Sequence, residues 1–174
     1  MVILLLALAV CGSDCRPPAE PDGVAAIRER YTDLRAAIAD EDGTDGLYRT
    51  EIVVNAGNAP FPALGDYLVT ITLYWTSEAG ESALAMAVRS GTYAAHSEYE
   101  ELMWDDSGDL QFRFFSWDNA TGERNEIRRW YANGSEIHAT ACTVTESGTE
   151  FRPPSEDDLI YEPEYFEELF ELLH

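Results

Sequence analysis

The spacing of hydrophobic and polar positions changes near residue 47. Before that point, the apolar residues recur every three or four positions, which is the spacing of one helix face; they are Val24, Ile27, Tyr31, Leu34 and Ile38. Asp22 can cap such a helix at its start, and the acidic stretch 40–46, with two glycines, ends it. Arg28 and Arg35 fall outside the stripe. We therefore expect an amphipathic helix that lies with a narrow apolar stripe on a sheet.

From residue 47 onward the period becomes two, most clearly between Tyr67 and Trp75. Turn-forming residues with a glycine separate the alternating segments, and Asn133-Gly134 is the strongest signal because both residues of a type I′ turn need positive φ. We predict a meander of six or seven antiparallel strands. Their expected spans are 47–55, 66–77, 83–92, 97–104, 109–117, 123–131 and 136–145.

The C-terminal region contains a second helical pattern. Arg152-Pro153-Pro154 ends the predicted sheet, and residues 163–173 place Phe166, Leu169, Phe170 and Leu173 on one helix face. An apolar face needs to be covered, so we expect this helix to dock on the domain. The predicted fold class is α+β: an N-terminal amphipathic helix packed on an antiparallel meander sheet, with a short C-terminal helix. A single domain spans 22–174.

The first 21 residues have the pattern of a leader and a tether. Residues 2–10 are apolar, too short for the about 20 residues of a membrane span, and typical of a signal peptide. Ala7-Leu8-Ala9 fits ordinary signal peptidase, whereas Leu8-Ala9-Val10-Cys11 resembles the lipobox of bacterial lipoproteins, although that family usually has Gly, Ala or Ser where Val10 stands. The resemblance implies a lipid on Cys11. We expect a signal peptide over 1–10 and a proline-containing tether over 11–21.

The cysteine count bears on the same question. An exported chain would carry Cys11, Cys15 and Cys142, which is an odd number for an oxidising compartment. With a lipid on Cys11, Cys15 and Cys142 could close one disulfide. The alternative is a buried free thiol at Cys142.

The chain carries a formal net charge of −22, and all eleven basic residues are arginines. This balance argues against binding to nucleic acid or to an anionic lipid surface, and it favours a soluble monomer. Contact with a membrane is expected through the lipid anchor alone. The absence of lysine has two alternative explanations, which are GC-rich codon usage and adaptation to high salt.

No catalytic or phosphate-binding signature is found, so catalysis is the less favoured interpretation and no cofactor is predicted. A weak calcium-loop pattern places Asp40, Asp42, Thr44 and Glu51 at EF-hand-like positions, but Asp45 stands where the sharp turn needs glycine. The segment that follows is a predicted strand and not a helix, so an acidic turn between helix and strand is the favoured interpretation of these residues.

Glu101 lies among aromatic residues in the pattern. A short hairpin of even length would put Glu101 beside Leu110, Phe112 and Phe114, where a carboxylate is costly to bury unless it is paired. One interpretation is a general acid in a pocket. The other is a carboxylate in contact with water, either because a β-bulge turns it outward or because this face of the sheet is open to solvent. Arginines on neighbouring strands are expected to pair with glutamates on a solvated face; they are Arg113, Arg124, Arg128 and Arg129, with Glu98, Glu100 and Glu126.

Three functions remain open. The first is an exported, lipid-anchored cell-envelope protein, periplasmic or on the outer surface, whose non-catalytic domain binds a protein partner. The second is a small-ligand binder or enzyme with an aromatic pocket between helix and sheet, which a cavity there would favour; the candidate residues are Tyr67, Trp75, Glu101, Trp104, Phe112, Phe114 and Trp130. The third is an acidic cation binder.

Overall fold

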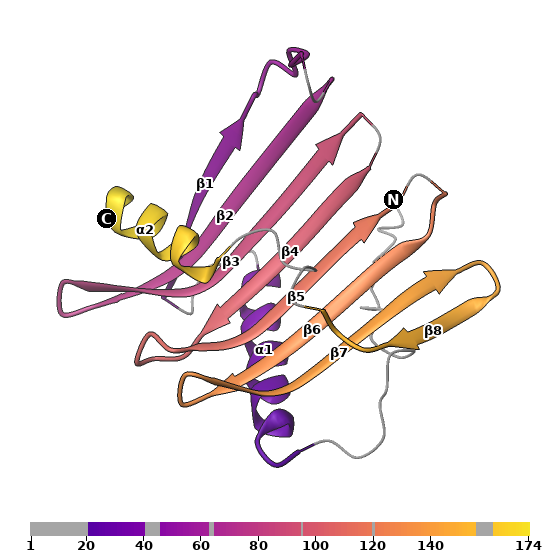
Figure 1. The fold of residues 1–174 in the computed structure, drawn as a ribbon. Helices are drawn as coiled ribbons and strands as arrows, with labels where there is room; N and C mark the ends of the chain where they lie inside the picture. The colour runs from indigo at the N-terminus through magenta and orange to yellow at the C-terminus, as the bar shows by residue number, and fades with distance from the viewer. Residues whose placement is uncertain (1–20, 41–45, 63–64, 95, 120, 156–161) are drawn as a thin grey trace, which may run out of the picture.

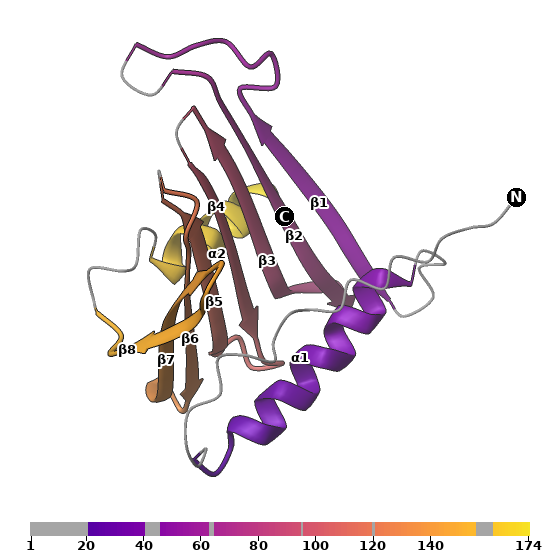
Figure 2. The same ribbon diagram turned by 90° about the vertical axis from the view of Figure 1, so that its right-hand side faces the viewer.

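The computed structural model describes residues 21–40, 46–62, 65–94, 96–119, 121–155 and 162–174. Within these residues, one antiparallel sheet of eight strands is a simple meander, in which each strand pairs with its neighbours in chain order. Helices α1 (Val24–Ala39) and α2 (Pro163–Leu173) lie on opposite faces of this sheet (Figures 1 and 2). The strands are β1 (Leu47–Val54), β2 (Tyr67–Glu78), β3 (Glu81–Tyr93), β4 (Ser97–Trp104), β5 (Leu110–Asp118), β6 (Arg124–Ala132), β7 (Ser135–Thr145) and β8 (Gly148–Arg152).

The hairpins follow from the turn residues. Asn133 and Gly134 join β6 to β7 with φ angles of 52° and 71°, the predicted positive pair. Ala79 and Gly80 join β2 to β3 with φ angles of 52° and 90°. Two-residue turns of this hand match the right-handed twist of the strands, which is why they recur in this meander.

The sheet has eight strands, which corrects the expectation of six or seven. The additional strand is β8, which pairs with β7 from Ala141–Arg152 to Thr145–Gly148. It has five residues, too few for a clear alternation, and it is a strand because the two-residue turn after Thr145 returns it to its neighbour. At the other end of the chain, the N-cap of α1 is Gly23, not the predicted Asp22.

Three register shifts occur near one end of the sheet, in the β2–β3, β4–β5 and β6–β7 hairpins. In β4–β5, Met103 pairs with Phe112 and Trp104 pairs with Leu110, so Gln111 is the extra residue of a bulge. The bulge moves Leu110 to the face opposite Phe112, which corrects the expectation that it lies beside Glu101. Glu101 itself pairs with Phe114 on the face that α1 covers.

Each face of the sheet has its own apolar cluster. On the α2 face, Phe166 and Phe170 pack with core residues that include Leu73 and Leu102. Trp104 belongs to the same cluster, and its Nε1 donates a hydrogen bond to Glu167 at 2.7 Å. On the α1 face the cluster is smaller and consists of Val24, Ile27, Met103, Phe112 and Trp130.

The α2 face also contains buried ion pairs. Arg113 Nη2 lies 2.5 Å from Glu100 Oε1, and their side chains are 2% and 0% exposed. Desolvation raises the pKa of Glu100 above its usual value, against the opposing effect of Arg113. The prediction of a solvated arginine face is therefore wrong for this pair, because Arg113 and Leu102 are cross-strand partners and share the interior under α2.

Candidate functional site

Helix α1 crosses the sheet above β4, β5 and β6, and its apolar stripe sets its position (Figure 2). Val24 and Ile27 are buried, while Tyr31 and Leu34 are partly buried against the same cluster. The Tyr31 ring meets the Phe112 ring edge-on, with centroids 5.0 Å apart. Because the stripe is narrow, only one side of the helix packs on the sheet, and space remains beside it.

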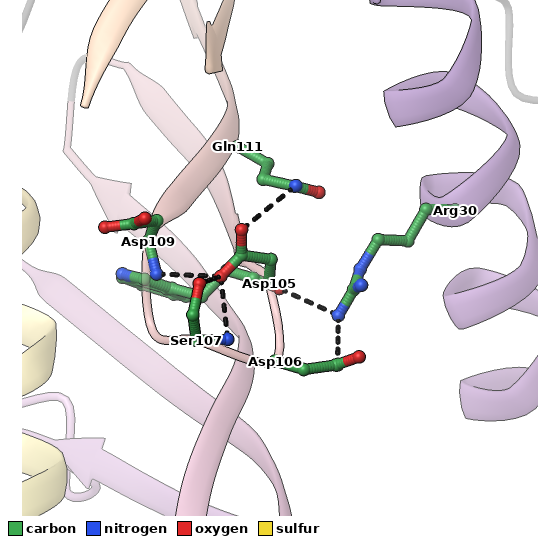
Figure 3. A network of polar contacts seen from close by, with 7 residues as sticks. Arg30, Asp105, Asp106, Ser107, Asp109 and Gln111 are labelled. Carbon is green, nitrogen blue, oxygen red and sulfur yellow. Dashed lines mark hydrogen bonds and ion pairs between the residues drawn. The ribbon is translucent and has the colours of Figure 1, made fainter. Parts of the chain in front are cut away.

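A polar clamp holds α1 against the β4–β5 hairpin (Figure 3). Arg30 Nη2 donates to the Trp104 carbonyl at 3.4 Å and to Asp106 Oδ1 at 2.6 Å. Asp105 Oδ1 accepts hydrogen bonds from the Ser107 backbone and hydroxyl and from the Asp109 backbone. Desolvation acts to raise the pKa of Asp105, but these hydrogen bonds outweigh it and the pKa lies below its usual value. The turn is thus closed by its own side chains.

Beside α1 the structure has a half-open cavity of about 670 Å³. This volume lies within the range of small-molecule sites, about 300–1,000 Å³. Its roof is the face of α1 that carries Ile27, Tyr31 and Arg35, and its floor is formed by side chains of the central strands. The floor residues used below are Tyr99, Glu101, Phe112, Phe114, Arg128 and Trp130.

Glu101 stands where the helix and the sheet meet. Its side chain is 3% exposed, and both of its carboxylate oxygens have partners. Oε2 accepts the hydroxyl of Tyr31 from α1, and Oε1 accepts the hydroxyl of Tyr99 from its own strand. Arg35 Nη1 lies 3.3 Å from Oε1. The carboxylate therefore connects α1 to β4, and its burial is compensated by three donors.

The surroundings of Glu101 keep its neighbours Tyr31, Tyr99 and Arg35 protonated. Burial, followed by the charge of Glu101 and the hydrogen bond to it, raises the pKa of Tyr31 and of Tyr99 well above the usual tyrosine range. For Arg35 the largest effect, desolvation, lowers the pKa, but the charge of Glu101 and the neighbouring tyrosines raise it overall. Both phenols thus remain hydrogen-bond donors, and Arg35 remains a cation.

Two further arginine–carboxylate pairs lie in the cavity. Arg128 Nη2 donates to Glu126 at 2.9 Å, and the Arg128 guanidinium lies 4.8 Å from the centre of the Phe114 ring. At the end of the cavity away from Trp130, Arg124 Nε lies 3.5 Å from Asp118 Oδ1, and Ser97 donates to Asp118 Oδ2 at 2.5 Å. These pairs present hydrogen-bonding groups of both kinds along the cavity.

The structure divides the seven predicted pocket residues between the two faces. Glu101, Phe112, Phe114 and Trp130 line the cavity together. Tyr67, Trp75 and Trp104 lie on the other face, where they belong to or pack against the cluster under α2. Glu101 is not turned to water: the bulge falls at Gln111, beyond the Glu101–Phe114 pair.

The predicted site contains none of the five cavity residues of α1, which are Ile27, Arg28, Tyr31, Thr32 and Arg35. The residue spacing assigns Tyr31 to the apolar stripe and places Arg28 and Arg35 outside it. Arg28 lies 5.2 Å from the centre of the Trp130 ring, and Arg35 reaches Glu101. The arginine spacing, seven residues on one side of the apolar stripe, was the available signal, but it could not tell which strands the helix would cross.

Of the three cysteines, the structure describes Cys142. Cys142 is fully buried and disulfide-bonded. Its predicted partner Cys15 and the lipidation candidate Cys11 lie outside the described residues.

Of the calcium candidates, Asp42 and Thr44 also lie outside the described residues, while Asp40 follows α1 and Glu51 pairs with Arg49. In the part of the chain that the structure describes, no group of three or more His, Cys, Asp or Glu side chains could hold a metal ion.

Neither described helix has the length and apolar character needed to cross a membrane. The chain matches no protein-family model, no curated protein and no solved structure.

Proposed function

We propose that the chain is an exported cell-envelope protein, anchored by a lipid on Cys11, whose folded domain binds a small molecule in the cavity between α1 and the sheet. The cavity is the observation that carries this proposal. It has the volume of a ligand site, and aromatic surface and paired polar groups converge on it. The leader pattern supports export, and so does the disulfide at Cys142, because disulfides persist in oxidising compartments.

The same geometry favours binding over catalysis. Both oxygens of Glu101 already accept hydroxyl groups, and Tyr31 and Tyr99 hold their protons. A general acid or base needs a free path to its substrate. Here the carboxylate serves to fix the helix over the site, and the ligand would meet the surrounding aromatic and polar side chains.

Two variants test whether the cavity is the binding site. Ser116 is a partly buried cavity residue on β5, and Ser116→Phe would fill the space. Thr76→Phe makes a similar enlargement at a partly buried strand residue outside the cavity. We expect protein purified from its host to carry a compound in native mass spectrometry, retained in Thr76→Phe and lost in Ser116→Phe. Wild-type protein without any bound compound, and without thermal stabilisation by host extracts, would contradict the proposal.

Anchoring is tested separately. Cell fractionation should place the wild type in the membrane fraction and Cys11→Ala in the soluble exported fraction. Intact mass should show a lipid on Cys11 and the loss of ten residues. An unlipidated species beginning at Val10 would refute the anchor and leave the cavity proposal standing.

Binding of a protein partner is a second candidate, and one observation favours it. β1 is an edge strand, and Tyr48, Val53 and Val54 on it are 40–50% exposed. An exposed apolar edge strand can accept a further strand from a partner. A photocrosslinker at position 53 should then give a protein adduct in the host, whereas one at the exposed Ser82 in the β2–β3 hairpin should not.

A further inference from the structure

The side chains that line the cavity restrict the chemistry of its ligand. Among the 19 described lining residues, Ile27 is the one aliphatic side chain, and the other apolar surface is aromatic. A site for an acyl chain would present flexible aliphatic groups along its length. Aromatic faces instead suit a flat, weakly polar surface such as the C–H face of a sugar ring. The lining therefore argues against a lipid tail.

The charges of the lining restrict the ligand further. Arg28, Arg35, Arg124 and Arg128 equal the four lining carboxylates in number, although the whole chain carries −22. The fourth carboxylate, Glu98, pairs with Arg89. Three of these arginines pair with carboxylates of the same cavity, and the pairs are Arg35–Glu101, Arg128–Glu126 and Arg124–Asp118. A ligand with a net charge would have to separate one of these pairs or face an equal number of like charges. An uncharged ligand meets no such cost.

The hydrogen-bonding groups match a polyhydroxylated molecule. Each arginine–carboxylate pair offers N–H donors and carboxylate acceptors side by side, and the serine hydroxyls can do both. Sugar hydroxyls likewise donate and accept. The end of the cavity away from Trp130 has such groups in Ser97, Asp118 and Arg124. The aromatic surface that remains partly exposed belongs to Tyr31, Tyr99 and Phe114, so an apolar ring face and a polar rim could be held at once.

We infer that the cavity binds an uncharged saccharide, such as the end of a neutral glycan. This inference rests on the proposed function, because it names the ligand class of the same cavity. Arg35, Arg124 and Arg128 act with their carboxylate partners as neutral units that both donate and accept hydrogen bonds. Phe112 and Trp130 are only 6% and 1% exposed. The sugar ring would therefore place its C–H face on the partly exposed rings of Tyr99 and Phe114.

The probes are an array of glycans that groups neutral, uronic-acid and amino sugars, together with dodecanoate and dodecylammonium in solution. We expect the wild type to bind neutral glycans. Titrations followed by tryptophan fluorescence should give dissociation constants about tenfold or more lower than those of matched charged glycans. Ser116→Phe should abolish this binding and Thr76→Phe should keep it.

Two further variants test the charge balance without filling the cavity. Arg124→Ala leaves the lining with one excess negative charge, and Asp118→Asn leaves it with one excess positive charge. We expect the first to gain affinity for amino sugars and the second to gain affinity for uronic acids, each relative to the neutral glycan. Unchanged preferences in both variants would overturn the charge argument.

Cavity-dependent binding of dodecanoate, dodecylammonium or charged glycans, in preference to neutral ones, would overturn the saccharide inference and leave the proposed function intact. Absence of binding to the whole panel would also overturn it. In that case a bound compound in native mass spectrometry of the host protein decides whether the proposed function survives.

Discussion

Replacing Glu101 by glutamine keeps the shape of the side chain and removes its charge at the junction of α1 and β4. The glutamate accepts the hydroxyls of Tyr31 and Tyr99 and faces Arg35 at 3.3 Å. In the glutamine variant one carboxylate oxygen becomes an NH₂ group, which donates and cannot accept. At least one hydroxyl then loses its acceptor, and the other retains a weaker, neutral one.

The cost follows from these contacts. Hydrogen bonds to a charged group contribute about 1.5–3 kcal/mol and neutral ones ~0.5–1.5 kcal/mol, so the loss of one bond and the weakening of the other cost about 2.5–4.5 kcal/mol. The neutral glutamine recovers part of this cost because it is less expensive to desolvate. Arg35 is 35% exposed, and its ion pair is screened by water, so it adds no more than ~0.5 kcal/mol. We expect Glu101→Gln to lower the free energy of unfolding by about 2–3 kcal/mol, a large part of the ~5–15 kcal/mol of a typical domain.

Urea denaturation at pH 7, followed by tryptophan fluorescence, measures this change. With a urea slope of ~2 kcal/mol per M, the midpoint should fall by about 1–1.5 M with the slope unchanged. Asp106→Asn is the matched control, because Asp106 also pairs with an arginine of α1, at 2.6 Å, but is 95% exposed. Its midpoint should move far less.

Glutamine avoids the desolvation cost of a buried charge, which acts against the loss of hydrogen bonds. If Glu101→Gln is as stable as the wild type, or more stable, desolvation outweighs the three donors and the account of this junction is refuted. A double-mutant cycle with Tyr31→Phe measures the interaction free energy between Tyr31 and Glu101. A value near zero would show that the Tyr31 hydroxyl does not stabilise the carboxylate.

Further predictions concern pH, the buried pair and the disulfide. Because the folded-state pKa values of Tyr31 and Tyr99 are raised, their contribution is complete below the unfolded tyrosine pKa of about 10 and is lost as pH rises above it. Between pH 10 and 12 stability should fall by up to about 1.4 kcal/mol per pH unit for each tyrosine, and the Tyr99→Phe variant should show a shallower slope in alkaline urea titrations. On the other face, Arg113→Leu should cost about 3–5 kcal/mol because it leaves Glu100 charged and buried, whereas Glu100→Leu combined with Arg113→Met should cost less in the same assay. Cys142 should resist alkylation in the unreduced, denatured protein and react after reduction, as counted by mass spectrometry.

The sequence predicts most of the fold where the signal is local. The helix stripe and the turns are contained in short windows, and Asn133-Gly134 adopts the φ values that its residue types favour. The missed strand β8 has no such window, because five residues obtain their strand conformation from pairing with β7. Likewise, one bulge at Gln111 moves Leu110 to the opposite face, and the local sequence has no pattern that predicts this bulge.

The site is predicted less completely because it depends on where the helix crosses the sheet. Glu101, Phe112 and Phe114 come from one hairpin, so strand pairing alone brings them together. Arg35 is 66 positions away from Glu101 in the chain, and its position on the helix alone predicts that it faces solvent. Only the tertiary packing of the apolar stripe decides that Arg35 reaches the buried carboxylate.

All basic residues of the chain are arginines, and this has a structural consequence on both faces of the sheet. Guanidinium groups are planar and weakly hydrated, so they can lie on an aromatic ring and still donate in several directions. Arg28 and Arg128 lie over the Trp130 and Phe114 rings, and Arg113 binds Glu100 under α2. A lysine ammonium at these positions would be a compact point charge without stacking surface and with a larger need for water. The acidic excess can therefore stay on the outer surface while the interior charges remain paired, and it is this pairing that gives the cavity a neutral, hydrogen-bonding lining.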